Sequence, residues 1–370
     1  MPGVIGPAQR LGGILLRSGV LGAILATLVA GQVAAAVNVT LRVSIGSCQF
    51  FGDTSPKKVV KFEWRDSDGS LKDRFSVKSD SDGNINSACY FPDVIESGDT
   101  IKVTVGTSSR TITVPRLTLN VDRDTDTAWG KSTPDTELHV ALSKANNSFN
   151  YDDFTFFDEF PTTDGSGAYS VDFGSLDGAD ILGSDYVDTY WTDANGDTVD
   201  LERSTPNFLA TIGKPYVDVD GNPGTTRSAS LYSVPSGTLL AHTTATLSDY
   251  DELRFYDADG SPVRVEPGNQ IVTDLASDAT LTVPTIAATI NKSTGKVTVN
   301  CGLGAGYAVF VATHDRNYVR YGNRSGHTNG SGIFVADFGV APKTAIKSGD
   351  NVQVYCMLAS GDTVSRVFTA

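Results

Sequence analysis

The stretch Ser348-Gly349-Asp350-Asn351-Val352-Gln353-Val354-Tyr355 places a glycine turn directly before a run of alternating apolar and polar residues. Such a turn followed by period-two alternation predicts a β-strand. The signature occurs four times, and its glycines at 98, 183, 268 and 349 are 85, 85 and 81 residues apart. This period is too long for a solenoid repeat and is typical of a small all-β domain with its own core. The other copies are Ser97-Gly98-Asp99, Gly183-Ser184-Asp185 and Pro267-Gly268-Asn269.

The first 36 residues have the composition of an export signal. Arg10 and Arg17 supply positive charge, residues 20–30 are apolar but short for a membrane span, and Ala34-Ala35-Ala36 offers small residues for cleavage. An uncleaved N-terminal anchor is the alternative. We expect a signal peptide at 1–36 and no membrane span after its removal.

The formal net charge is −14, and it becomes −16 without the two arginines of the leader. An acidic surface of this kind repels nucleic acid, so we expect no nucleic-acid partner. Charged residues make up only 19% of the chain, while serine, threonine, glycine and aspartate are abundant. This balance is typical of a β-rich extracellular protein, exported or displayed on the cell surface, whose partner would be an extracellular protein or glycan.

Prolines mark the predicted joints between domains. Pro115, Pro206 and Pro284 each stand between two strand-like segments, where the missing N–H of proline is tolerated. No segment has a sustained helical period, so we expect almost no helix. We predict an all-β chain of four tandem immunoglobulin-like β-sandwich domains after the signal peptide, at 37–115, 116–206, 207–284 and 285–370. The short joints favour a semi-rigid rod.

The four cysteines divide evenly between the first and the last predicted domain. In an oxidising compartment this division predicts two disulfides within domains, Cys48–Cys89 and Cys301–Cys356. A metal site is a poor alternative because no pair has C-x-x-C spacing. A reducing compartment would leave free thiols.

Several turn motifs resemble those of bacterial immunoglobulin-like tandem repeats. They are Gly130-Lys131-Ser132-Thr133-Pro134-Asp135-Thr136, the Asp-Gly-x-Gly-x-Tyr turn at 164–169, and Asp193-Ala194-Asn195-Gly196-Asp197. Such repeats occur in secreted and cell-surface proteins, including adhesins and biofilm-associated proteins. The resemblance implies the sandwich fold, and the family has no shared catalytic residues.

Clustered aspartates near the joints are candidate metal ligands, because calcium prefers several carboxylate and carbonyl oxygens. Counted as an EF-hand loop from Asp122, the sixth position is Thr127 and the twelfth is Thr133, so that motif fails. Aspartates in hairpin turns are the other interpretation. Structural calcium at a joint stays open, with Asp122, Asp124, Asp126, Asp218 and Asp220 as its candidate ligands. We expect no other cofactor.

Aromatic residues crowd one stretch of the second domain and alternate with acids. Aromatic rings flanked by carboxylates suit sugar binding, whereas a strand with its aromatics in the core is the alternative. The candidate ligand-binding residues are Tyr151, Asp153, Phe154, Phe156 and Phe157.

Motifs of catalysis are missing from the sequence. It has no G-x-S-x-G elbow and no phosphate-binding glycine loop, and its four histidines have no ligand spacing. We therefore expect no enzyme. The sequence favours a secreted or surface-displayed structural or adhesive protein, acting as a spacer or interaction rod. The alternative is an extracellular glycan- or ligand-binding protein that uses the aromatic and acidic stretch of the second domain.

Overall fold

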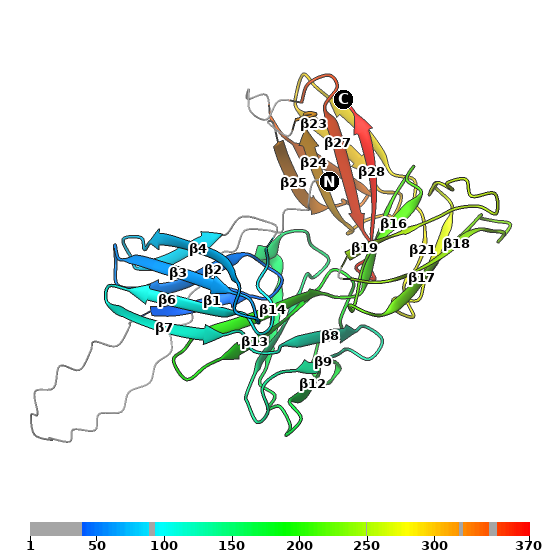
Figure 1. Cartoon of the computed structure of the whole chain (residues 1–370). Helices are drawn as coiled ribbons and strands as arrows, with labels where there is room; N and C mark the ends of the chain where they lie inside the picture. The colour runs from blue at the N-terminus through cyan, green and yellow to red at the C-terminus, as the bar shows by residue number, and fades with distance from the viewer. Residues whose placement is uncertain (1–38, 89–92, 249, 318–320, 340–345) are drawn as a thin grey trace, which may run out of the picture. The chain divides into compact units, whose positions relative to one another are not determined.

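The computed structural model describes residues 39–88, 93–248, 250–317, 321–339 and 346–370. These residues form 28 β-strands and two single turns of 3-10 helix, η1 (Tyr151–Asp153) and η2 (Phe173–Ser175), and they contain no α-helix. The strands pair in six sheets that form sandwich-like domains (Figure 1). The prediction of an all-β chain is confirmed. The predicted signal peptide at 1–36 lies outside the described residues, and within them no helix has the length and apolarity to cross a membrane.

Strand group 1 consists of the first seven strands. β1, β2 and β5 lie in one sheet, and β4, β3, β6 and β7 lie in the other. On β3, Val60, Phe62 and Trp64 are buried, because every second side chain of a strand points to the same face. The strands are β1 (Val39–Ser44), β2 (Gln49–Thr54), β3 (Val59–Arg65), β4 (Leu71–Lys78), β5 (Asn84–Ala88), β6 (Thr100–Val105) and β7 (Ser108–Thr113).

Three further groups of seven strands repeat this pairing: the first, second and fifth strands share one sheet, and the fourth, third, sixth and seventh share the other. Strand group 2 comprises β8 (Thr118–Asp122), β9 (Thr127–Lys131), β10 (His139–Lys144), β11 (Thr155–Glu159), β12 (Ala168–Asp172), β13 (Tyr186–Thr192) and β14 (Thr198–Ser204). Strand group 3 comprises β15 (Asn207–Thr211), β16 (Tyr216–Asp220), β17 (Thr226–Tyr232), β18 (Leu239–Thr246), β19 (Tyr250–Arg254), β20 (Gln270–Thr273) and β21 (Thr280–Thr282). Strand group 4 comprises β22 (Ala287–Asn291), β23 (Lys296–Asn300), β24 (Ala308–His314), β25 (Tyr321–His327), β26 (Ile333–Asp337), β27 (Asn351–Met357) and β28 (Thr363–Thr369).

Two sheets continue from one strand group into another. β1 pairs in parallel with β14, with Arg42 opposite Thr198 and Ser44 opposite Asp200. β15 pairs in parallel with β28 in the same manner. Each junction joins the first strand of one group to the last strand of the next and produces a seven-stranded sheet. The pairing satisfies backbone groups that a free edge strand would expose. The domain boundaries stay a prediction, and the first and third of them are crossed by these sheets.

The buried apolar residues form three clusters. Strand group 1 has a cluster around Phe50, Phe62 and Trp64, which also contains Val199 of strand group 2. Strand group 2 has a cluster of its own. Strand groups 3 and 4 share one cluster, in which Phe208 and Val354 both lie. This sharing differs from the expectation of a separate core in every domain.

The repeated turn signature has one structural role in all four groups. Asp99, Asp185, Asn269 and Asp350 each accept a hydrogen bond from the backbone N–H three residues earlier, at 3.0, 2.7, 2.8 and 2.7 Å. Each of these side chains thus closes a tight turn just before the sixth strand of its group. A glycine precedes the acceptor in three copies, with φ of 93° at Gly98, 86° at Gly268 and 86° at Gly349. A side chain is disfavoured at such angles, so glycine fits this position.

The second copy of the turn has a different partner. In the other three copies the glycine N–H donates to a carbonyl at the end of its own group, namely that of Val114, Val283 or Ala370. In the second copy Ser184 stands at the position of the glycine, and Gly183 before it donates its N–H to the carbonyl of Ser360 in strand group 4, at 2.8 Å. The reversed order Gly-Ser-Asp in this copy therefore coincides with a contact between strand groups 2 and 4.

The structure contains the predicted disulfide of strand group 4. Cys301 and Cys356 are joined with a Cα–Cα distance of 6.1 Å across 55 residues of sequence, and both are fully buried. The predicted Cys48–Cys89 pairing involves Cys89, which lies outside the described residues.

Candidate functional site

Three strands of group 2 expose an aromatic surface. We call it the aromatic face and define it by His139, Phe156, Phe160 and Tyr190. The His139 ring stacks on Phe160 with 4.9 Å between centroids and on Tyr190 with 5.0 Å. His139 Nε2 lies 2.7 Å from Asp158 Oδ1, and Phe156 and Phe160 are 59% and 60% exposed. The face thus offers flat apolar rings beside a carboxylate, on the side of the sheet away from the core.

The sequence-predicted ligand residues fall into three environments. Tyr151 and Phe154 stack at 4.5 Å beside η1, and Tyr151 is 41% exposed. Phe156 lies on the aromatic face, whereas Phe157 points the other way and packs against the core of strand group 2. Asp153 accepts a hydrogen bond from the Ser148 hydroxyl at 2.8 Å. The structure therefore places Phe156 on the same side of its strand as Asp158, and it keeps Phe157 on the opposite side, toward the core.

Beside the aromatic face, β13 carries a buried carboxyl group. Asp188 lies opposite Glu202 on β14 and is 9% exposed. Burial, and then the nearby carboxylates of Glu202 and Asp200, raise the pKa of Asp188 to about 8. Asp200 is held by Arg42 Nε at 2.9 Å and by the Ser44 hydroxyl at 2.8 Å, both from β1. The carboxyl group of Asp188 is thus protonated and neutral over much of the pH range in which a surface aspartate is charged.

The clustered aspartates act as hydrogen-bond acceptors for separate segments. Asp122 Oδ1 accepts from Asp124 N at 2.8 Å within its own turn, and Asp126 Oδ1 accepts from Ile181 N at 2.8 Å. Asp124 Oδ1 accepts from Ser277 N at 2.7 Å, a bond that lowers the pKa of Asp124. The three carboxylates therefore have three different partners.

The other two candidate metal ligands, Asp218 and Asp220, lie on β16 and pair with Leu209 and Asn207 of β15. In the described part of the chain, no group of three or more histidine, cysteine, aspartate or glutamate residues is arranged to hold a metal ion. Calcium stays a prediction.

Acidic hairpin turns follow one pattern. The Oδ1 atom of the first residue accepts from the backbone N–H groups two and four residues later, as Asp164 does from Ser166 at 2.8 Å and Ala168 at 2.9 Å. The Ser166 hydroxyl also donates to Asp164 and is the main reason that the pKa of Asp164 is low. The same pattern occurs at Asp66, Asp80, Asp193, Asp257 and Asn329.

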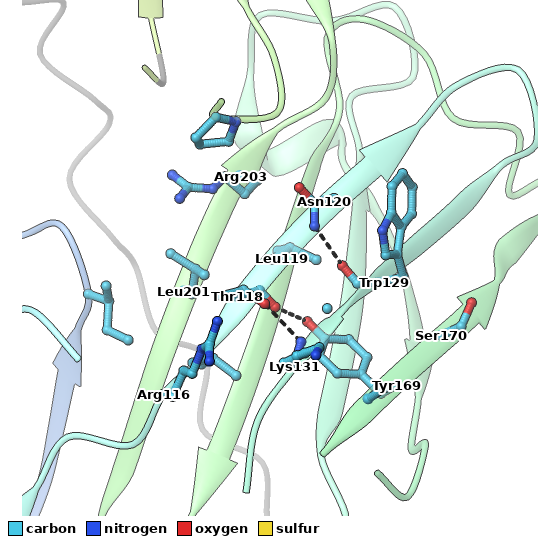
Figure 2. A pocket seen from close by; sticks show the side chains of 15 residues that line it. Arg116, Thr118, Leu119, Asn120, Trp129, Lys131, Tyr169, Ser170, Leu201 and Arg203 are labelled. Carbon is cyan, nitrogen blue, oxygen red and sulfur yellow. Dashed lines mark hydrogen bonds between the residues drawn. The ribbon is translucent and has the colours of Figure 1, made fainter. Parts of the chain in front are cut away.

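A cleft of about 690 Å³ lies on strand group 2, on the side of β8 and β9 (Figure 2). We call it the basic cleft, because its charged lining residues are Arg116, Lys131 and Arg203. Trp129, Tyr169 and Leu201 contribute apolar surface to it. Sequence reasoning missed this site, since its residues are spread from Ile45, after β1, to Pro223, after β16, and no local motif joins them.

The chain is similar, at low sequence identity, to solved structures of adhesion and biofilm-associated proteins. A tetra-tandem repeat in the extending region of a large adhesion protein matches with 11% identity over 90% of this chain and 98% of that chain, at a TM-score of 0.19. A structure described as a 1.5-MDa bacterial ice-binding adhesin matches with 12% identity over 90% and 98%, at 0.19. The BSP domain of a biofilm-associated protein matches with 9% identity over 94% and 98%, at 0.17.

No protein-family model matches the chain, and no curated relative does.

Proposed function

We propose that this chain is an exported structural or adhesive protein, displayed on the cell surface or secreted, which acts as a spacer or interaction rod without catalysis. In this proposal a signal peptide directs export, and four immunoglobulin-like β-sandwich domains follow it. The observation that carries the proposal is the pairing of β1 with β14 and of β15 with β28. Backbone pairing between groups restrains their relative motion far more than a flexible linker does, as a spacer requires.

Buried polar contacts also restrain the strand groups relative to one another. The Arg123 guanidinium of strand group 2 donates to the Pro206 carbonyl at 2.7 Å and to the Ser360 carbonyl at 2.8 Å. It also pairs with Asp278 of strand group 3 at 2.9 Å. One side chain therefore ties together residues from three strand groups. The disulfide Cys301–Cys356 supports an oxidising, extracellular location.

Small-angle scattering of the mature chain tests the rod. A single globule of roughly 330 residues would have a radius of gyration of about 20 Å, and a rod of four domains exceeds this clearly. A value at or below about 20 Å contradicts the rod. Amino-terminal sequencing of the exported protein tests the leader, and we expect a new terminus directly after Ala36.

A second function is favoured by the aromatic face. Phe156 and Phe160 are more than half exposed, which is unusual for phenylalanine and is common at binding surfaces. We propose this face as the site of the alternative function, the binding of an extracellular glycan or other ligand. Phe156→Ala is then expected to abolish binding of any neutral sugar that the wild type captures on a glycan array. If the wild type captures none, glycan binding by the aromatic face is excluded.

A further inference from the structure

The basic cleft has the dimensions of a ligand site. Its volume of about 690 Å³ lies within the range of small-molecule pockets in proteins. Most of the lining comes from strand group 2, on the side of β8 and β9, with Ile45 from directly after β1 of strand group 1 and Pro223 from strand group 3. The cleft is therefore built where three strand groups meet, a common location for ligand sites.

The charge of the cleft is opposite to that of the chain. Three of its fifteen lining residues are basic and none is acidic, although the chain has 43 acidic and 29 basic residues. Among the described residues, neither Arg116 nor Lys131 has a carboxylate within ion-pair distance, and both are exposed. The positive charge of Lys131 also lowers the pKa of Asp164, as a smaller cause than the hydrogen bonds from Ser166 and Ala168. A chain that repels anions overall thus has one concave region that attracts them.

The cleft also contains an exposed aromatic ring. Trp129 on β9 is 39% exposed and points to the same side of its strand as Lys131. Gly130 between them faces the core, where a Cβ would lie only 1.8 Å from the Thr118 carbonyl oxygen, so a side chain does not fit there. Figure 2 shows Trp129, Lys131 and Arg116 around the cleft, with Leu119 and Leu201 between them and Arg203.

We propose that the basic cleft binds an anionic sugar. The carboxylate or sulfate group of the sugar pairs with Lys131 and Arg116, and an apolar face of its ring packs on Trp129. The side chains of Asn120 and Ser170, which also line the cleft, are available to sugar hydroxyls. An acidic peptide would satisfy the charges, but it has no flat apolar face for Trp129. The site is on a different surface from the aromatic face, and the proposal goes beyond the spacer function.

Calorimetric titration of the mature full-length chain tests this proposal. The probes are a tetramer of galacturonic acid, its methyl ester, which has the same ring without the charge, and a heparin tetrasaccharide for sulfate. We expect at least one anionic probe to bind, the methyl ester to bind about tenfold more weakly or not at all, and the affinity to fall as salt is raised. Lys131→Gln is expected to weaken binding about three- to tenfold, and Trp129→Ala about tenfold or more.

Matched variants separate this site from other surfaces. Lys102→Gln removes an exposed lysine on β6, and Tyr256→Ala removes an exposed ring in strand group 3; both are expected to leave the affinity unchanged. Lys131 and Trp129 are exposed, so their variants are expected to melt as the wild type does. The proposal is overturned if neither anionic probe binds below ~5 mM. It is also overturned if the methyl ester binds as tightly as the anionic probes, or if a tetraglutamate peptide binds more tightly than they do. Binding of the anionic probes that is unchanged by both Lys131→Gln and Trp129→Ala would overturn it as well. None of these outcomes bears on the scattering test of the rod.

Discussion

Arg123 and Asp362 form an ion pair between strand groups 2 and 4, 239 residues apart in sequence, and both side chains are 1% exposed. The Nη1–Oδ1 distance is 3.2 Å, and Asp362 also accepts from Phe208 N at 3.0 Å. Burial raises the pKa of Asp362, and the attraction of Arg123 counters this effect. An uncompensated charge at this position is costly, so the pair makes the packing of these groups sensitive to a single side chain.

Arg123→Met is expected to lower the free energy of unfolding by about 3–5 kcal/mol, since it leaves Asp362 charged, buried and without its cation. Arg123→Met combined with Asp362→Asn is expected to recover about 1–2 kcal/mol of that loss. Denaturant unfolding measures both. Arg74→Met, at a side chain that is 62% exposed, serves as the control and is expected to change the stability by less than about 1 kcal/mol. A double variant that is no more stable than Arg123→Met would contradict this account.

Asn222 is expected to be essential where strand groups 2 and 3 meet. It is 6% exposed, its Oδ1 accepts from Val121 N at 2.8 Å, and its Nδ2 donates to Val121 O at 2.8 Å. The Asn222 amide thus makes with Val121 of β8 the two backbone hydrogen bonds that a residue of a neighbouring strand would make. Asn222→Ala leaves both backbone groups unsatisfied and is expected to cost about 2–3 kcal/mol. Asn120→Ala, which removes only a 3.5 Å contact, is the control for the denaturation experiment.

Asp188 is expected to make stability depend on pH. Its folded pKa of about 8 is above the ordinary value of about 3.9, so the folded state holds the proton more tightly. Stability is therefore lost as pH rises between about 4 and 8. Asp188→Asn is expected to stabilise the protein at pH 8 by about 2–4 kcal/mol and to have little effect at pH 4. Melting curves across this range measure the difference. An Asp188→Asn curve parallel to the wild type at every pH would show that the carboxyl group titrates normally.

Reduction of Cys301–Cys356 is expected to affect strand groups 3 and 4 together. The bond closes a loop of 55 residues, for which the chain-entropy model predicts about 4 kcal/mol. Because Phe208 and Val354 belong to one cluster, the loss should spread from strand group 4 into strand group 3. Hydrogen exchange of a Cys301→Ala/Cys356→Ala variant measures this. We expect faster exchange on β15 and β27 and unchanged exchange on β3; acceleration confined to strand group 4 would show that the shared cluster does not couple the two groups.

The sequence predicted the individual strands better than it predicted the pairing and packing between strand groups. The turn at Asp350 and the alternation after it indicated β27 correctly, because both signals are local. The pairing of Arg42–Ser44 with Thr198–Asp200 has no such signal, since any strand edge offers the same backbone groups. Arg123 lies between Asp122 and Asp124 in the sequence, and its burial depends on residues up to 239 positions away. The basic cleft was missed for the same reason, because its charges converge only after folding.

The parallel pairing of β1 with β14 also determines how the molecule responds to tension. Val39 begins the first strand of a two-group unit and Ser204 ends its last strand, and these two strands are neighbours that run in the same direction. Opposed pulling at the two ends therefore slides the strands lengthwise past each other, and the hydrogen bonds between them are loaded in shear. Bonds loaded in this way resist together, whereas a hairpin opened from its end yields one bond at a time. The same geometry recurs where β15 meets β28, so each half of the chain has its own mechanical clamp.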